Sequence, residues 1–115
     1  MRRMVVKVSV DQPKANITRI ALEGRLDVAG TQAAETEFNA AVASSLNVIV
    51  DLSKVAFVSS VGIRMLVAGA QDRSKAGGKM VLAQPDELTK RILHTTGIEQ
   101  IVPVYGGLDE ALACF

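Results

Sequence analysis

The chain has 115 residues, of which 49% are apolar and 22% charged, with 13 basic against 12 acidic side chains. This length and composition predict one packed globular domain over residues 1–115 that folds without a disulfide or a metal. The near balance of charge and an aromatic content of 3% argue against a nucleic-acid-binding protein, which usually carries a basic excess or stacking side chains.

The cysteine and histidine content excludes several kinds of site. Cys114 and His94 are the only residues of their types, so neither an internal disulfide nor a typical zinc site is expected. No nucleophile-elbow motif accompanies His94, and no apolar run approaches the ~18 residues of a membrane span. We therefore expect a cytoplasmic protein that is not an enzyme, with no cofactor, metal, nucleic acid or membrane span.

The N-terminal part of the chain predicts a β-hairpin. Residues 5–11 and 17–23 alternate between two kinds of side chain, as half-buried strands do. Asp11 to Asn16 contains Pro13 and predicts a turn that is too short for a crossover, so the strands should be antiparallel. Gly24 should end the second strand, and residues 24–30 should form a loop.

After the hairpin, the expected elements alternate between helix and strand. In chain order they are a helix over 31–46 with Thr31 as its N-cap, a buried strand over 48–50 with Asp51 at its C-terminal end, a helix over 60–76, a buried strand over 80–83, a short helix between Pro85 and Gly97, an edge strand over 101–105 containing Pro103, and final helical turns over 108–113. This order predicts an α/β domain with a largely parallel sheet.

The helix expected over 60–76 carries two apolar stripes. On a helical wheel, one stripe is the expected core face and consists of Ile63, Leu66, Val67 and Ala70. The opposite stripe lies beside Ser60 and Arg64 and consists of Val61, Met65 and Ala68. An apolar stripe on the outer side of a helix suggests a partner-binding surface, although single surface apolar residues are also ordinary.

Two serines, Ser59 and Ser60, stand where this helix should begin. The first amides of a helix lack internal partners, and the helix dipole leaves partial positive charge there. A serine at such a position caps the helix, or it presents a hydroxyl or a phosphate at a site that favours anions.

Three stretches together resemble the STAS domain of bacterial anti-sigma factor antagonists. They are Gly24-Arg-Leu-Asp27, the segment from Val48 to Val55 followed by Phe57-Val-Ser-Ser-Val-Gly-Ile63, and Gly78-Lys-Met-Val-Leu82 with Leu93 to Ile98. The resemblance extends over nearly the whole chain. It implies the STAS fold, a single mixed, mostly parallel sheet that opens with an antiparallel hairpin and is packed by helices.

The resemblance also implies a function, partner switching. The unmodified domain binds an anti-sigma factor, which is a serine kinase of the histidine-kinase ATPase type, and so frees a sigma factor. Phosphorylation of a serine at the start of the second helix ends binding, and a serine phosphatase restores it. The residues that the resemblance and the outer stripe place in the partner surface are Asp27, Ser59, Ser60, Val61, Gly62, Arg64, Met65 and Ala68.

One departure from the family pattern bears on this regulation. The family's Asp-Ser-Ser-Gly becomes Ser59-Ser60-Val61-Gly62, so valine occupies the position of the usual phosphoacceptor. Either Ser60, or in second place Ser59, accepts the phosphate, or the protein binds its partner constitutively.

Other functions are also compatible with parts of the sequence. STAS domains also occur in stress-signalling assemblies and as accessory subunits of lipid-transport ATPases. A receiver-like phosphoacceptor domain would suit Asp51 at the end of a central strand. However, the opening hairpin and the lack of an acidic pair after the first strand disfavour it. A small enzyme would need convergent acid, base or nucleophile groups, and none is evident in the sequence.

Overall fold

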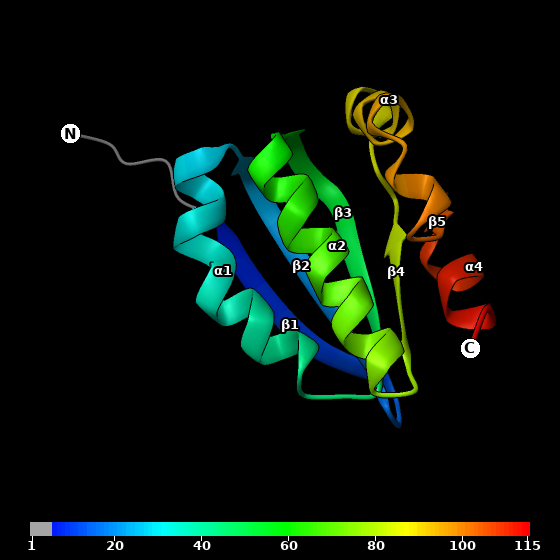
Figure 1. Ribbon diagram of the computed structural model, residues 1–115. Helices are drawn as coiled ribbons and strands as arrows, with labels where there is room; N and C mark the ends of the chain where they lie inside the picture. The colour runs from blue at the N-terminus through cyan, green and yellow to red at the C-terminus, as the bar shows by residue number, and fades with distance from the viewer. Residues whose placement is uncertain (1–5) are drawn as a thin grey trace.

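A computed structural model describes residues 6–115. The strands in this range form one five-stranded sheet in the order β1-β2-β3-β4-β5 (Figure 1). β1 pairs with β2 antiparallel, and the other neighbours pair parallel. The strands are β1 (Lys7–Lys14), β2 (Ile17–Leu26), β3 (Asn47–Val58), β4 (Lys79–Ala83) and β5 (Val104–Tyr105). The predicted α/β class and mixed sheet with an opening hairpin are confirmed.

The hairpin turn is shorter than predicted. β1 runs through Pro13 to Lys14, and Asn16 in the turn adopts a left-handed conformation with φ of 66°. Pro13 is tolerated because β1 lies at the edge of the sheet, where a missing amide donor breaks no ladder. Val5, which belonged to the predicted alternation, lies outside the described residues.

The helices divide unequally between the two faces of the sheet. α1 (Val28–Val42), α2 (Ser60–Lys75) and α3 (Glu87–Thr96) contribute to the larger core cluster, and α4 (Leu108–Ala113) packs on the other face (Figure 1). α4 covers Ile49 and Val81, because Ala111 belongs to the same buried cluster as these residues. β3 is therefore apolar on both faces at its start, as predicted for residues 48–50.

Four further predicted boundaries are wrong, the first being the end of the helix expected over 31–46, which lies at Val42. Residues 24–30 form no loop, because β2 runs to Leu26 and Asp27 caps α1 directly, which leaves Thr31 inside the helix instead of at its N-cap. β3 does not end at Asp51 but continues to Val58, since Leu52, Val55 and Val58 remain buried in the core. The last strand, expected over 101–105, is only Val104–Tyr105, because the amides of Ile101 and Val102 donate to the carbonyl oxygen of Ile98 at the end of a 3₁₀ turn over residues 98–100.

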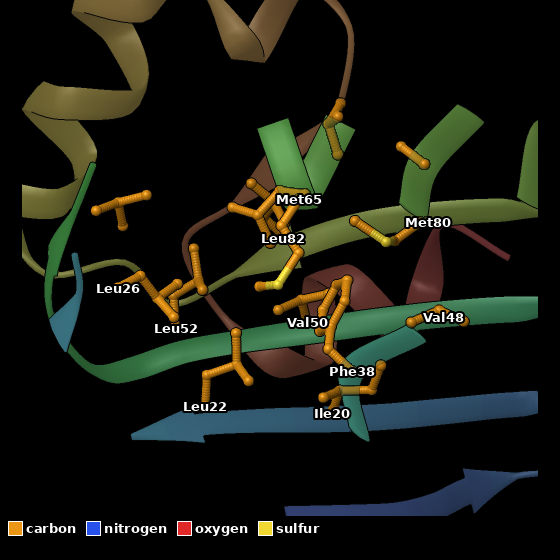
Figure 2. Packing of buried hydrophobic residues seen from close by; sticks show 14 of the residues in the cluster. Ile20, Leu22, Leu26, Phe38, Val48, Val50, Leu52, Met65, Met80 and Leu82 are labelled. Atoms are coloured by element: carbon orange, nitrogen blue, oxygen red, sulfur yellow. The ribbon is translucent and has the colours of Figure 1, made fainter. Parts of the chain in front are cut away.

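The orientation of α2 also differs from the prediction. Met65 was expected to face outward, but its side chain is only 4% exposed. Figure 2 shows it directed among Val50 and Leu82 of the sheet. Leu66 and Ala70 are buried as predicted, whereas Ile63 and Val67 are half-buried at the margin of the core. The predicted outward stripe is therefore not a single surface.

Two glycines explain this orientation. A Cβ atom at Gly62 would lie 3.0 Å from the carbonyl oxygen of Leu26, and one at Gly69 would lie 3.2 Å from Cε2 of Phe38. These contacts mark the line along which α2 approaches β2 and α1 most closely. The helical-wheel prediction used only the apolar side chains. It therefore did not place Gly62 and Gly69, with Met65, on the buried side of the helix.

Candidate functional site

Two helices begin side by side at the carboxyl ends of the neighbouring strands β2 and β3. β2 and β3 are parallel and pair in register, with Leu26 opposite Val58. The next residue of each strand, Asp27 and Ser59, is the N-cap of α1 and of α2. Figure 1 shows that α1 and α2 begin at the same end of the sheet. The amide of Ser59 donates to the carbonyl oxygen of Leu26 at 2.8 Å, so a hydrogen bond joins the two helix starts directly.

Both capping side chains are engaged with their own helices. Oδ1 of Asp27 accepts a hydrogen bond from the amide of Gly30 at 2.7 Å, and Oγ of Ser59 accepts one from the amide of Gly62 at 3.3 Å. The remaining first-turn amides and the helix dipoles add partial positive charge at both helix starts, and the carboxylate of Asp27 offsets this charge at α1. The start of α2, whose cap is an uncharged serine, suits an anionic group or a hydrogen-bond acceptor of a partner.

The two candidate phosphoacceptors lie in different environments. Ser59 is half-buried and its hydroxyl is engaged as the helix cap, whereas Ser60 is exposed as the first residue of α2. Val61, at the position of the usual family acceptor, is half-buried. Ser60 therefore presents the more accessible hydroxyl of the pair.

Beside the helix starts, Arg25 and Phe57 form a cation–π contact that the sequence patterns did not predict. They are direct partners in the β2–β3 register, and the guanidinium carbon of Arg25 lies 4.7 Å from the centroid of the Phe57 ring. Nε of Arg25 also lies 3.9 Å from Oδ2 of Asp27, and both side chains are about half exposed. A signal was available, because each residue stands two positions before a helix cap, in Arg25-Leu-Asp27 and Phe57-Val-Ser59.

The other predicted partner residues are dispersed along α2. Arg64 is exposed one turn after Ser60 and lies on the same side of the helix. Ala68 is exposed farther along and lines a shallow groove between α1 and α2. Gly62 is buried against β2, and Met65 lies in the core. Only part of the predicted set thus gathers around the helix starts.

His94 lies on α3, apart from the capping residues in sequence, and its side chain is 79% exposed. Its Nδ1 lies 2.5 Å from Oε1 of Glu99. Among residues 6–115, no three His, Cys, Asp or Glu side chains are grouped so as to hold a metal ion. None of the helices in this described part has the length and apolar character needed to cross a membrane.

Comparison with known proteins places the chain among STAS domains. The family described as the STAS domain matches residues 9–111. An anti-sigma factor antagonist from Mycobacterium paratuberculosis has a crystal structure that superposes with a TM-score of 0.84 at 29% identity, covering 95% of this chain and 92% of that one. BtrV of Bordetella bronchiseptica, assigned as an anti-sigma factor antagonist, is 26% identical over 95 residues, 82% of each protein.

The same fold also occurs inside a larger protein. The murine anion transporter Slc26a9 contains a region that superposes on 97% of this chain with a TM-score of 0.77, at 14% identity, and this region is 22% of the transporter chain. Identity this low shows a shared fold alone. The resemblance to STAS domains that the three sequence stretches carried is confirmed.

Proposed function

Because this chain belongs to the STAS domain family, we propose that it is an anti-sigma factor antagonist, which binds an anti-sigma factor at the start of α2 and so frees a sigma factor. The observation that carries the proposal is the pairing of the α1 and α2 starts through the Ser59 amide and the Leu26 carbonyl. Relatives that are called anti-sigma factor antagonists match most of the chain, which supports the same function.

The contact surface that we propose is centred on the two helix starts. This helix-start surface consists of Arg25, Asp27, Ser59, Ser60, Val61 and Arg64, each exposed or half-buried. It combines an accessible hydroxyl, a partly exposed valine and charges of both signs. Met65 is left out because it packs in the core, and Gly62 contributes by letting α2 lie close to β2.

The regulation that we propose acts through Ser60. The partner would be a serine kinase of the histidine-kinase ATPase type, and it would supply ATP and the chemistry of phosphoryl transfer. A phosphate on Ser60 would add about −1.5 to −2 charges at the centre of the helix-start surface. Such a charge opposes burial against an apolar or acidic partner surface, so binding would end until a serine phosphatase removes it.

The valine at position 61 predicts that this kinase is specialised. Ser60 and Val61 lie about 100° apart around the helix axis. In-line phosphoryl transfer depends on positioning, so a kinase built for the usual family position would meet the methyl groups of Val61. A cognate kinase that modifies this chain should therefore be shifted toward Ser60, and a generic family kinase should modify neither residue.

A binding assay with the anti-sigma factor from the same cell tests the proposed function. The unmodified chain and Ser60→Ala should bind, and Ser60→Glu should bind at least about tenfold more weakly, because it places charge at the centre of the contact. Arg91→Glu, an exposed change on α3, is the control and should bind like the unmodified chain. Failure of the unmodified chain to bind would contradict the proposal.

Mass spectrometry after incubation with the bound partner and ATP tests the regulation separately. Phosphate on Ser60 that is lost in Ser60→Ala supports the shifted switch. Binding without any phosphorylation supports a constitutive antagonist and contradicts the switch. Val61→Ser should create an acceptor for a generic family kinase at small cost in stability.

A further inference from the structure

The edge strand β1 presents an unpaired side of the sheet. Within residues 6–115 it pairs with β2 alone, and all of its residues but Val8 are exposed. Val10 is 51% exposed, which is unusual for a large apolar side chain in a strand. An edge of this kind offers backbone hydrogen bonds to another strand unless charges or prolines block it.

The side chains of β1 divide by face in a regular way. Val8 packs against the core that α1 and α2 cover, and Val10 follows on that same face by the alternation of the strand. Lys7, Ser9 and Asp11 line a shallow groove on the opposite, open face. Within the chain, Lys7 stands opposite Glu23 of β2, and Asp11 stands opposite Arg19 and pairs with its guanidinium at 2.5 Å.

We propose that β1 pairs with β1 of a second copy of this chain, antiparallel, with Ser9 opposite Ser9 at the two-fold axis. The segment Lys7-Val-Ser-Val-Asp11 is its own complement in this arrangement. Lys7 of each copy stands opposite Asp11 of the other, and Val8 stands opposite Val10. Directly opposed cross-strand pairs of opposite charge or of β-branched residues stabilise a sheet.

The pairing extends two rows that each copy already contains. On the open face, Glu23 and Lys7 of one copy continue into Asp11 and Arg19 of the other, so the charge alternates across four strands. On the helix-covered face, Leu22 and Val8 continue into Val10 and Ile20, so the row is apolar throughout and covers the exposed Val10.

The charges also select one register. If one strand were shifted by two residues so that Val10 lay opposite Val10, Lys7 would lie opposite Pro13 and Asp11 opposite Ser9, and both ion pairs would be lost. Lysine and proline at an edge normally oppose pairing, but Pro13 lies beyond the five residues that pair here.

The interface is small, so we expect weak, concentration-dependent association. It shares no residue with the helix-start surface and is independent of the proposed function.

Sedimentation equilibrium of the full chain tests the pairing. From about 10 µM to about 1 mM, the mass should rise from 12.2 kDa toward twice that value, as a small interface predicts. Lys7→Glu and Asp11→Lys should each weaken self-association by about tenfold or more, because each places like charges opposite one another twice in the dimer. An equimolar mixture of the two variants should associate again, since every opposed pair is then of opposite charge.

Two controls make these results specific to the register. Lys14→Glu changes the same charge on the same strand outside the paired segment, and it should associate like the unmodified chain. Thermal unfolding of each variant shows whether it is folded. The proposal is overturned if the unmodified chain stays monomeric over this range or if the mixture does not recover. It is equally overturned if Lys14→Glu weakens association as much as Lys7→Glu does.

A cross-link supplies a second measurement. Ser9→Cys in a Cys114→Ser background should form a disulfide-linked dimer on mild oxidation, because directly opposed residues of paired strands lie within disulfide reach. Ser53→Cys in the same background, an exposed serine of β3, should cross-link much less. Equal cross-linking of the two variants would contradict the proposed axis at Ser9.

Discussion

The two sides of α2 differ in their surroundings, because the inner side packs against the rest of the domain and the outer side is exposed. The inner side consists of residues that touch the sheet and α1, which are Gly62, Met65, Leu66, Gly69 and Ala70. The outer side carries Ser60, Arg64 and Ala68, which are exposed. Apolar residues occur on both sides, so hydropathy alone did not distinguish them. The glycines did, because they mark where the helix axis comes closest to its neighbours.

This difference separates residues that act on stability from residues of the proposed binding surface. The inner side is packed against Phe38, Met80 and Leu82, and a change there alters the free energy of unfolding. The outer side begins at the exposed end of the helix, where a change should alter binding while leaving the fold intact. Neighbouring residues of α2 therefore offer matched pairs of variants with opposite expected results.

The largest expected effect comes from charge on the inner side. Met65→Asp should lower the free energy of unfolding by about 4 kcal/mol or more, because it removes a buried side chain and places a carboxylate in the core. Arg64→Asp, one position away on the outer side, should change it by no more than about 0.5 kcal/mol. Urea unfolding measures both, and equal midpoints for the two variants would mean that α2 is rotated differently.

A size change on the inner side should have the next largest effect. Gly69→Leu should cost about 1–3 kcal/mol of stability, because its Cβ alone would lie 3.1 Å from Sδ of Met80 and 3.2 Å from Cε2 of Phe38. Ala68→Leu adds the same side chain one residue earlier on the exposed side and should be nearly neutral. The urea midpoints compare the two, and a neutral Gly69→Leu would show that the close approach is not needed.

The two serines at the helix start should differ by a smaller amount. Ser59→Ala should cost about 0.5–2 kcal/mol, because it removes the side chain that accepts from the Gly62 amide. Ser60→Ala should change stability by less than about 0.5 kcal/mol, since its side chain is exposed. Thermal unfolding distinguishes the variants. If Ser60→Ala is the more destabilising, the cap is assigned to the wrong serine.

The smallest expected effect concerns the charge of a helix cap, which is the uncharged Ser59 in α2 and the carboxylate of Asp86 in α3. The hydrogen bond from the amide of Thr89, at 2.8 Å, lowers the pKa of Asp86 below its ordinary value. A pKa that is lower in the folded state gives a stabilisation present above the unfolded-state pKa and lost as the pH falls through the folded value.

Asp86→Ser tests this contrast. It should unfold at a slightly lower temperature than the unmodified chain near neutral pH, and the difference should shrink as the pH is lowered through the range where Asp86 protonates. The difference caused by Ser59→Ala should not shrink in this way, because a serine does not titrate there. A pH-independent difference for Asp86→Ser would contradict the role of its charge.

Local sequence patterns were sufficient to predict the order of elements and the start of α2. Alternation identified the hairpin, and the predicted helix over 60–76 matches the observed Ser60–Lys75 because Ser59 caps it and Gly77, with a φ of 88°, follows its end. The order of three weak motifs was sufficient to indicate the STAS family. These features are local or ordered along the chain, so they can be read without contacts between distant segments.

The buried side of α2 and the set of residues that meet at the helix starts depend on contacts between distant segments. Asp27 and Ser59 are 32 positions apart in the sequence, and they become neighbours because β2 and β3 end in register. Met65 is buried because Gly62 and Gly69 let α2 approach its neighbours at that angle. Both outcomes depend on how separate elements pack, a property that the periodicity of a single segment does not contain.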